Sequence, residues 1–326
     1  MQKKKILILT EVSPQVGFGH LNRCIFLAKK LNKYFKVYFF FLKNDLKRLY
    51  PKKYSILNLS DFNTNKKLNF SALLIDLKKI DTDKLHLINE LGIKKKITIS
   101  DKVIKKIKPI FSIIPYILKK NFNNKKIISG INSIIYDEKL KFFIKKKKIK
   151  KKHKQVAICM GGSDPENFTI KVVNDLINLG FDKVQFNIII GPMFDIMRQI
   201  QLKNTIKSKV NFKLYKNPVN FYNILKNSDL GIINSGNIKY ELLALGVPFL
   251  LFSNDTNSKK FCKYFSKYFK FYYFNNFQYP GIDYITTILK KLMNNDKEFD
   301  IYSNYNKKLI RLDAVKKISK YINSIV

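Results

Sequence analysis

A histidine near the amino terminus follows two glycines, a setting suited to proton transfer on a bound ligand. It is His20, in the segment Gly17-Phe18-Gly19-His20-Leu21-Asn22-Arg23, which comes after the apolar run Ile6–Leu9. This order predicts a strand, a glycine loop and a helix. Gly17 and Gly19 would let a ligand approach the backbone closely, and the first amides of a helix can face that ligand. Because an imidazole exchanges a proton near neutral pH, His20 is a candidate general base.

Three further polar residues of the first half could act beside His20. Arg23 comes one helical turn later and could position the imidazole, bind an anionic group or lie on the surface. Asp76 and Asp101 each follow an apolar run that predicts a strand. Either carboxylate could orient the imidazole or bind sugar hydroxyls, and aspartates at strand ends are equally common as helix caps. At the level of sequence these alternatives stay open.

A glycine pair in the second half has the pattern of a phosphate or sugar contact. Gly161, Gly162 and Ser163 follow the apolar run Val156–Cys159. The pattern favours either a close approach of the backbone to a ligand or ordinary turn and cap chemistry.

A second loop could hold a diphosphate. Ser235, Gly236 and Asn237 follow the apolar run Leu230–Ile233 and precede a helical pattern. At a helix amino terminus they could bind phosphate oxygens through amide donors and the helix dipole, without a metal ion. Glu241, one turn further along, could accept hydrogen bonds from both ribose hydroxyls. It is also the kind of residue that the dipole favours in a first turn.

The spacing of apolar residues predicts an α/β fold in both halves of the chain. Several apolar runs are apolar on both faces, which is typical of parallel strands covered on each side. The predicted strands are Ile6–Leu9, Val37–Leu42, Ala72–Ile75, Ile97–Ser100, Val156–Cys159, Phe186–Ile190, Leu230–Ile233 and Val247–Phe252. We therefore expect two doubly wound, Rossmann-like domains that face a cleft at the carboxyl ends of their strands.

Capping residues predict where two of the intervening helices begin and end. One runs from Thr82 to Leu91, with Thr82 as a possible N-cap and Gly92 just past its end. The other starts at Glu166, with Ser163 or Asp164 as its cap.

A lysine-rich run divides the chain. Residues 145–154 carry eight lysines and are expected to be a solvated linker. It separates an N-terminal domain, 1–144, from a C-terminal UDP-binding domain, 155–326, whose terminal helices could cross back.

Composition limits the function classes. The net charge is +40, but only four of the 63 basic residues are arginines and the lysines are spread along the chain, so no specific nucleic-acid site is expected. Three distant cysteines fit neither a disulfide framework nor a metal site, and they favour a cytoplasmic protein. No apolar stretch is long enough to span a bilayer. We expect no metal and no cofactor, and the sequence makes no prediction about oligomeric state.

Three collinear blocks resemble a known family, the UDP-sugar hydrolase of pseudaminic acid biosynthesis, PseG, which has a glycosyltransferase-B fold. The blocks are Gly17 to Arg23, Ile158 to Asn167, and Ile232 to Glu241. The resemblance implies release of UDP from UDP-2,4-diacetamido-2,4,6-trideoxy-β-L-altropyranose by attack of water at the anomeric carbon with inversion. It also implies a role in the modification of flagellin or surface glycans.

The resemblance assigns roles to several residues. His20 matches the general base, Ser235 to Asn237 the diphosphate loop, Glu241 the ribose-binding carboxylate and Asn257 a cleft asparagine. Asp76 is followed by Leu77-Lys78, where the family often places a tyrosine. The family's nucleotide-binding residues are therefore matched better than its sugar-binding residues. A glycosyltransferase of the same fold with a UDP-sugar donor and a degenerate nucleotide-sugar-binding protein are the alternatives.

Overall fold

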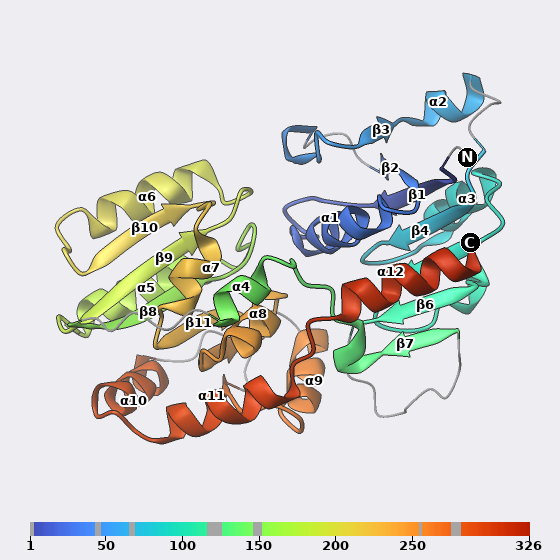
Figure 1. Ribbon diagram of the computed structural model, residues 1–326. Coiled ribbons are helices and arrows are strands. Elements are labelled where there is room, and N and C mark those ends of the chain that lie inside the picture. Colours follow the sequence, from blue (N-terminus) through green and yellow to red (C-terminus); the bar gives the residue numbers. More distant parts are fainter. Residues whose placement is uncertain are drawn as a thin grey trace. The chain divides into compact units, whose positions relative to one another are not determined.

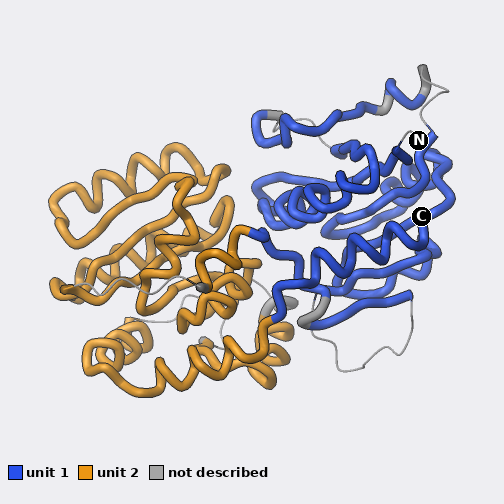
Figure 2. The backbone as a smooth tube through the Cα atoms, viewed as in Figure 1, with its two compact units in different colours: residues 1–138, 311–326 blue, residues 139–310 orange. Residues whose placement is uncertain are grey.

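The chain folds into two compact units in a computed structural model, which describes residues 3–42, 47–64, 69–115, 126–145, 152–253, 256–274 and 282–326. The first unit comprises residues 1–138 and 311–326, and the second comprises residues 139–310 (Figure 2).

The first unit is built on a seven-stranded parallel sheet in the order β3-β2-β1-β4-β5-β6-β7 (Figure 1). Its strands are β1 (Lys5–Thr10), β2 (Lys36–Phe41), β3 (Ser55–Leu57), β4 (Ala72–Asp76), β5 (Lys96–Ile99), β6 (Phe111–Ile114) and β7 (Ile127–Ser129). Its helices are α1 (Gly19–Leu31), α2 (Leu59–Thr64), α3 (Thr82–Glu90) and α12 (Ala314–Ile325), with single 3-10 turns at Lys47–Leu49, Lys105–Ile107 and Gly130–Ser133. The central strand β1 is buried on both faces from Ile6 to Leu9, which explains its unbroken apolar sequence.

The last helix, α12, belongs to the first unit although it comes from the far end of the sequence (Figure 2). It packs against α1, and the ring of Tyr321 lies 4.6 Å from that of Phe111. Its apolar residues Val315, Ile318 and Ile322 are buried.

The second unit has a six-stranded parallel sheet in the order β10-β9-β8-β11-β12-β13 (Figure 1). Its strands are β8 (Lys154–Cys159), β9 (Val184–Ile190), β10 (Phe212–Lys216), β11 (Leu230–Asn234), β12 (Phe249–Phe252) and β13 (Tyr272–Phe274). Its helices are α4 (Leu140–Lys145), α5 (Phe168–Asn178), α6 (Ile196–Ile206), α7 (Phe221–Lys226), α8 (Ile238–Leu245), α9 (Thr256–Phe265), α10 (Ile282–Met293) and α11 (Glu298–Leu309).

Each sheet has a point where the strand order reverses direction. In the first unit this point lies between β1 and β4, and in the second it lies between β8 and β11. Loops that leave neighbouring strands in opposite directions open a crevice at the carboxyl edge, which is where open α/β sheets bind ligands. The order of strands therefore selects the loops after β1, β4, β8 and β11 as candidate site loops.

The eight strands predicted from sequence are all present, with ends within two residues of those expected. Five further strands, β3, β6, β7, β10 and β13, were not predicted. Most are short and lie toward the sheet edges, where fewer residues are buried and the apolar signal is weak.

One predicted helix cap and one predicted helix start are corrected. The side chain of Asp81, rather than Thr82, caps α3 by accepting a hydrogen bond from the Lys84 amide at 3.0 Å. The other helix, α5, begins at Phe168 instead of Glu166. Its cap from Asp164 is confirmed, because that carboxylate accepts from the Phe168 amide at 3.0 Å and from the amide that follows.

The division into units differs from the predicted boundaries at both ends. Helix α4 begins before the predicted boundary at residue 144, yet it packs against α7 and α8 of the second unit, with the rings of Phe143 and Tyr222 5.7 Å apart. Residues 311–326, assigned to the C-terminal domain as helices that could cross back, do return to the first unit. Residues 146–151 of the predicted linker lie outside the described residues, and Lys154 already belongs to β8.

Candidate active site

The loop between β1 and α1 carries His20 to the carboxyl edge of the first sheet. Gly17 adopts a left-handed φ of +83°, and its amide donates to the Ser13 carbonyl at 2.8 Å. A side chain at this φ would be strained, which explains the glycine. Gly19 is the first residue of α1, so His20 lies in the first turn of that helix.

His20, Arg23 and Asp76 form one hydrogen-bonded cluster. Nδ1 of His20 lies 2.7 Å from Oδ1 of Asp76. The Arg23 guanidinium binds both oxygens of the same carboxylate, through Nε to Oδ2 at 2.5 Å and Nη2 to Oδ1 at 2.5 Å. The Asp76 side chain is fully buried, Arg23 is 7% exposed and His20 is 17% exposed. The imidazole is therefore the member of the cluster that reaches the surface.

The partners of Asp76 keep it ionised. Burial alone would raise the pKa of this carboxyl group, but the charges and hydrogen bonds of Arg23 and His20 outweigh it and lower the pKa to about 2. Cys24 is a further donor, with Sγ 3.5 Å from Oδ2, and its burial raises the pKa of the thiol. A buried carboxylate with this many donors is satisfied in its charged form.

The ionised carboxylate fixes the tautomer of His20. Because a carboxylate without a proton can only accept, the hydrogen of neutral His20 must reside on Nδ1, and we assign it there from the hydrogen-bond network. The lone pair then lies on Nε2. Arg23 Nη2 is 3.0 Å from Nδ1, and the shared Asp76 carboxylate holds these two donors together. The arrangement presents a base whose orientation is set by buried groups.

Sequence reasoning missed Glu11, which ties the loop after β4 to the loop after β1. Its carboxylate accepts from the Lys78 amide at 2.5 Å and from Lys84 Nζ at 3.0 Å. The Lys78 side chain also donates to the Gln15 carbonyl at 2.9 Å. Lys78 occupies the position where the resembled family often has a tyrosine. Its side chain lies against the loop that carries His20. An acidic residue two positions after the predicted strand Ile6–Leu9 was the signal that could have revealed Glu11.

Asp101 does not join the cluster. It is exposed and follows β5, which is one strand further from β1 than β4 is. Within the described residues the imidazole is oriented by Asp76, to which Arg23 also donates. Of the two roles left open for Asp101, orientation of His20 falls to Asp76, and binding of sugar hydroxyls stays a prediction.

In the second unit one side chain joins the two predicted glycine loops. Nδ2 of Asn234, at the end of β11, donates to the Met160 carbonyl at the end of β8, at 2.6 Å. Its Oδ1 accepts from the Gly236 amide at 3.1 Å. Gly161 has a φ of +87°, and a Cβ there would lie 3.3 Å from Asn234 Nδ2. Asn234 thus sets the spacing of the loops at the strand-order reversal, a role that sequence reasoning did not give it.

The loop after β9 packs on the same glycines. A Cβ at Gly191 would lie 2.5 Å from the Cα of Gly162, so only glycine fits there. The Met193 amide donates to the Gly162 carbonyl at 3.0 Å. Ser163 is buried directly after this contact. These contacts show that the loops after β8, β9 and β11 pack closely around Gly161 and Gly162.

The predicted diphosphate loop is accessible. Ser235 is half-buried, whereas Gly236 and Asn237 are exposed immediately before α8. Glu241 is half-buried one turn into α8 and accepts from the Tyr222 hydroxyl at 3.3 Å. Asn257 lies in α9, and its side chain is outside the described residues.

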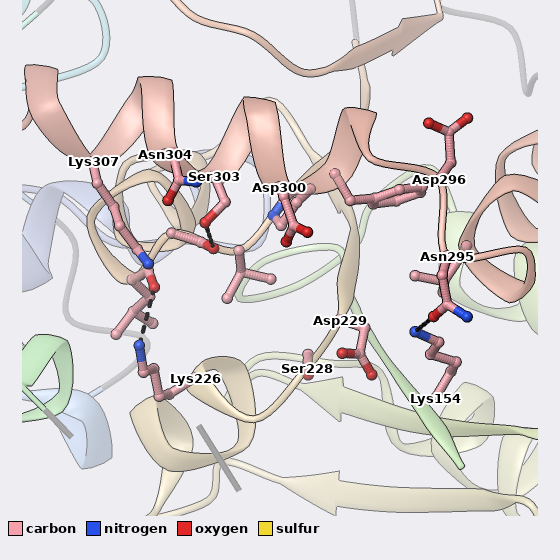
Figure 3. A pocket seen from close by; sticks show the side chains of 16 residues that line it. Lys154, Lys226, Ser228, Asp229, Asn295, Asp296, Asp300, Ser303, Asn304 and Lys307 are labelled. Carbon is pink, nitrogen blue, oxygen red and sulfur yellow. Dashed lines mark hydrogen bonds between the residues drawn. The ribbon is translucent and has the colours of Figure 1, made fainter. Parts of the chain in front are cut away.

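A cavity of about 300 Å³ lies at the opposite, amino edge of the second sheet (Figure 3). Lys154 at the start of β8, Asp229 before β11 and Pro248 before β12 line it, together with α11. It is separate from the glycine loops.

Among the described residues, no group of three or more His, Cys, Asp or Glu side chains could hold a metal ion. No helix in the same part of the chain is long and apolar enough to cross a membrane.

The fold defined by these two parallel sheets is that of the glycosyltransferase-B class, in agreement with the predicted fold class. The chain is similar to Acinetobacter baumannii MurG, with a TM-score of 0.67, 11% identity and coverage of 98% of this chain and 99% of that one. It is similar to S. aureus MnaA in a structure with UDP, with a TM-score of 0.62, 12% identity and coverage of 99% and 96%. The spinosyn rhamnosyltransferase SpnG with thymidine diphosphate gives a TM-score of 0.65, 10% identity and coverage of 98% and 99%.

In sequence, the chain is 29% identical over 286 residues to the uncharacterized protein MJ1062 of Methanocaldococcus jannaschii. The match covers 81% of this chain and 58% of that protein, so the chain spans less than two thirds of the length of this relative. No known family profile matches the sequence.

Proposed function

We propose that the protein is a UDP-sugar hydrolase that releases UDP by attack of water at the anomeric carbon. The observation that carries the proposal is the His20–Asp76 hydrogen bond of 2.7 Å, which commits Nδ1 to a buried carboxylate. Nε2 is thereby left as the basic nitrogen of a partly exposed ring, as a general base requires.

The proposed reaction needs one proton acceptor and one stabilised leaving group. Nε2 of His20 takes a proton from water while the water oxygen bonds to the anomeric carbon. The bond from that carbon to the diphosphate oxygen breaks, and UDP leaves with the electron pair. Asp76 stabilises the imidazolium that forms, and Arg23 keeps Asp76 ionised.

Nucleotide binding is assigned to the second unit. The Ser235–Asn237 loop precedes an eight-residue helix, whose amides and dipole favour a diphosphate. Gly161, Gly162 and Asn234 set the shape of the loops beside it. Glu241 would accept from the ribose hydroxyls. The structures of the two proteins of like fold with UDP and thymidine diphosphate support a nucleotide ligand.

The resemblance in three sequence blocks supports a UDP-2,4-diacetamido-2,4,6-trideoxyhexose as the substrate, in nonulosonic (pseudaminic) acid biosynthesis. Because Lys78 stands where the family often has a tyrosine, the test substrates should vary mainly in their sugar.

The test is release of UDP from a panel of UDP-sugars in water, without an acceptor and with EDTA present. We expect release by the native protein and at least a 100-fold slower rate in His20→Ala, an effect of the size typical of a general base. UDP binding, measured by calorimetry, should persist in that variant. Asp182→Asn is the control, because this exposed carboxylate precedes β9 at the amino edge of the second sheet, away from the His20 cluster and the glycine loops.

Each other outcome has a defined meaning. Full activity in His20→Ala would remove His20 from the mechanism. Release that requires an added acceptor would favour a glycosyltransferase, the activity in the name of the similar protein SpnG. UDP binding without release from any sugar would favour a nucleotide-sugar-binding protein.

A further inference from the structure

The outer face of helix α6 is apolar where the helix begins. Ile196, Met197 and Ile200 are 64%, 72% and 49% exposed. The inner face is apolar as well, because Leu202 is buried in the core of the second unit and Ile206 packs against the same core. A surface helix of a globular protein ordinarily turns polar residues outward, so the apolar outer face requires an explanation.

Basic residues continue the same face of α6. Counting from Ile196, the positions i+4, i+7 and i+11 form one stripe along the helix, and they are Ile200, Lys203 and Lys207. Both lysines are exposed. The stripe is therefore apolar over its first half and cationic over its second half. Together with Met197, these residues are called the α6 face below.

The strand that follows α6 extends the positive charge. Strand β10 lies at the edge of the second sheet (Figure 1). Exposed lysines lie before, on and at the end of this strand, at Lys209, Lys213 and Lys216. Val219, three residues after the strand, is fully exposed. The sequence from residue 196 to 220 contains six basic residues and no carboxylate, so this surface attracts anions.

The charge selects the kind of partner. Asp195, the acidic residue nearest in sequence, already accepts from the Arg198 amide at 2.9 Å as the cap of α6. Two copies of the α6 face brought together would set lysines against lysines, and the net charge of +40 repels a second chain as a whole. Protein interfaces are in general depleted in lysine. Apolar side chains beside lysines instead suit the boundary between the headgroups and acyl chains of an anionic bilayer.

We propose that the α6 face is a docking surface for a lipid bilayer with anionic headgroups. Its three apolar side chains enter the boundary between headgroups and acyl chains, and its two lysines lie at the level of the lipid phosphates. The lysines of β10 add attraction at longer range. The inference is independent of the proposed hydrolysis, since none of these residues belongs to the candidate active site.

The second unit offers a matched control on another helix. Ile301 in α11 is 62% exposed, close to the value for Ile196, but the exposed carboxylate of Asp300 directly precedes it. Helix α11 lies beside β13, the opposite edge strand of the sheet, where the Tyr272 hydroxyl donates to Glu298 at 2.9 Å (Figure 1). Ile301→Ser therefore removes the same side chain, at nearly the same exposure, from outside the α6 face.

The experiment measures cosedimentation with vesicles of phosphatidylcholine alone and with vesicles of equal parts phosphatidylcholine and phosphatidylglycerol. We expect the native protein to bind the anionic vesicles at least about tenfold more tightly. Ile196→Ser should weaken binding to the anionic vesicles about 5- to 25-fold, because it withdraws a largely exposed apolar side chain from the acyl boundary. Ile301→Ser should weaken it by less than about twofold.

The lysines are tested by a second pair of variants. Lys203→Gln/Lys207→Gln should weaken binding to the anionic vesicles about 30-fold, since each lysine near an anionic surface contributes about fivefold. Lys290→Gln/Lys308→Gln removes two exposed lysines from α10 and α11 and should weaken it by less than about threefold. Met197→Ser repeats the apolar test at a second position and should lower the affinity in the same direction as Ile196→Ser.

Four results would overturn the inference. The first is a native protein that binds neither kind of vesicle, or both equally. The second is an equal loss of affinity in Ile196→Ser and Ile301→Ser. The third is loss in the Lys203→Gln/Lys207→Gln variant with none in Ile196→Ser or Met197→Ser, which would indicate attraction to any polyanion by charge alone. The fourth is a native dimer in analytical ultracentrifugation that Ile196→Ser dissociates, which would show that a second copy covers the face.

Discussion

Replacing Asp76 by asparagine tests the charge arrangement on which the candidate base depends. The substitution leaves the 7%-exposed Arg23 guanidinium without the carboxylate that binds it in two places. Removing one partner of a buried ion pair costs about 3–5 kcal/mol of unfolding free energy. The lowered pKa of Asp76 gives an independent value for the free energy that favours its ionised form. The fall from 3.8 to about 2 corresponds to about 2 kcal/mol of preference for the ionised carboxyl in the folded protein.

The pH dependence has a defined sign. A carboxyl group whose pKa is lower in the folded than in the unfolded state stabilises the fold at pH values above its unfolded pKa of about 4. This stabilisation is lost as the pH falls toward the folded value of about 2. The difference in stability between the native protein and Asp76→Asn should therefore be constant from pH 7 to about pH 5 and decrease below about pH 4.

Urea unfolding followed by circular dichroism, repeated from pH 7 to pH 3, measures this difference. Asp101→Asn is the control, because its carboxylate is exposed, and it should change stability by less than about 0.5 kcal/mol at every pH. Equal losses in the two variants, or a difference that persists unchanged at pH 3, would show that the Arg23–Asp76 pair does not hold the cluster together.

Three further predictions concern both units. Asp76→Asn should lower kcat for UDP release by about 10³- to 10⁴-fold, because the imidazole loses the acceptor that fixes its tautomer; a change confined to KM would argue against this. Gly191→Ala should lower the unfolding free energy by about 1–3 kcal/mol in thermal or urea unfolding, since its Cβ would lie 2.5 Å from the Gly162 Cα, and no loss would mean that the loops are not in contact. Glu241→Gln should weaken UDP binding about tenfold in calorimetry but leave the affinity for 2′,3′-dideoxy-UDP unchanged. Equal losses of affinity for both nucleotides would show that Glu241 does not bind the ribose.

The fold was largely predictable because its signal is local. Strands such as β1 and β4 are buried on both faces, so their sequences are continuous apolar runs. Glycines that end α5 and α8, Gly180 and Gly246, have left-handed φ values of +65° and +67°. The edge strands were harder to predict, and the return of the terminal helices to the first unit was predicted only as a possibility, because both depend on packing partners distant in sequence.

The candidate chemistry was evident from the sequence alone: a histidine after two glycines, two glycine-bearing loops after strands, and the fold class. The carboxylate that orients His20 became clear only from strand pairing. Pairing of β1 with β4 sets Thr10 opposite Asp76, while Asp101 follows a strand one place further away. Tertiary structure also gave Asn234 its role in spacing the glycine loops. In both cases strand order and burial choose the partners of a polar group, and neither can be read from local spacing.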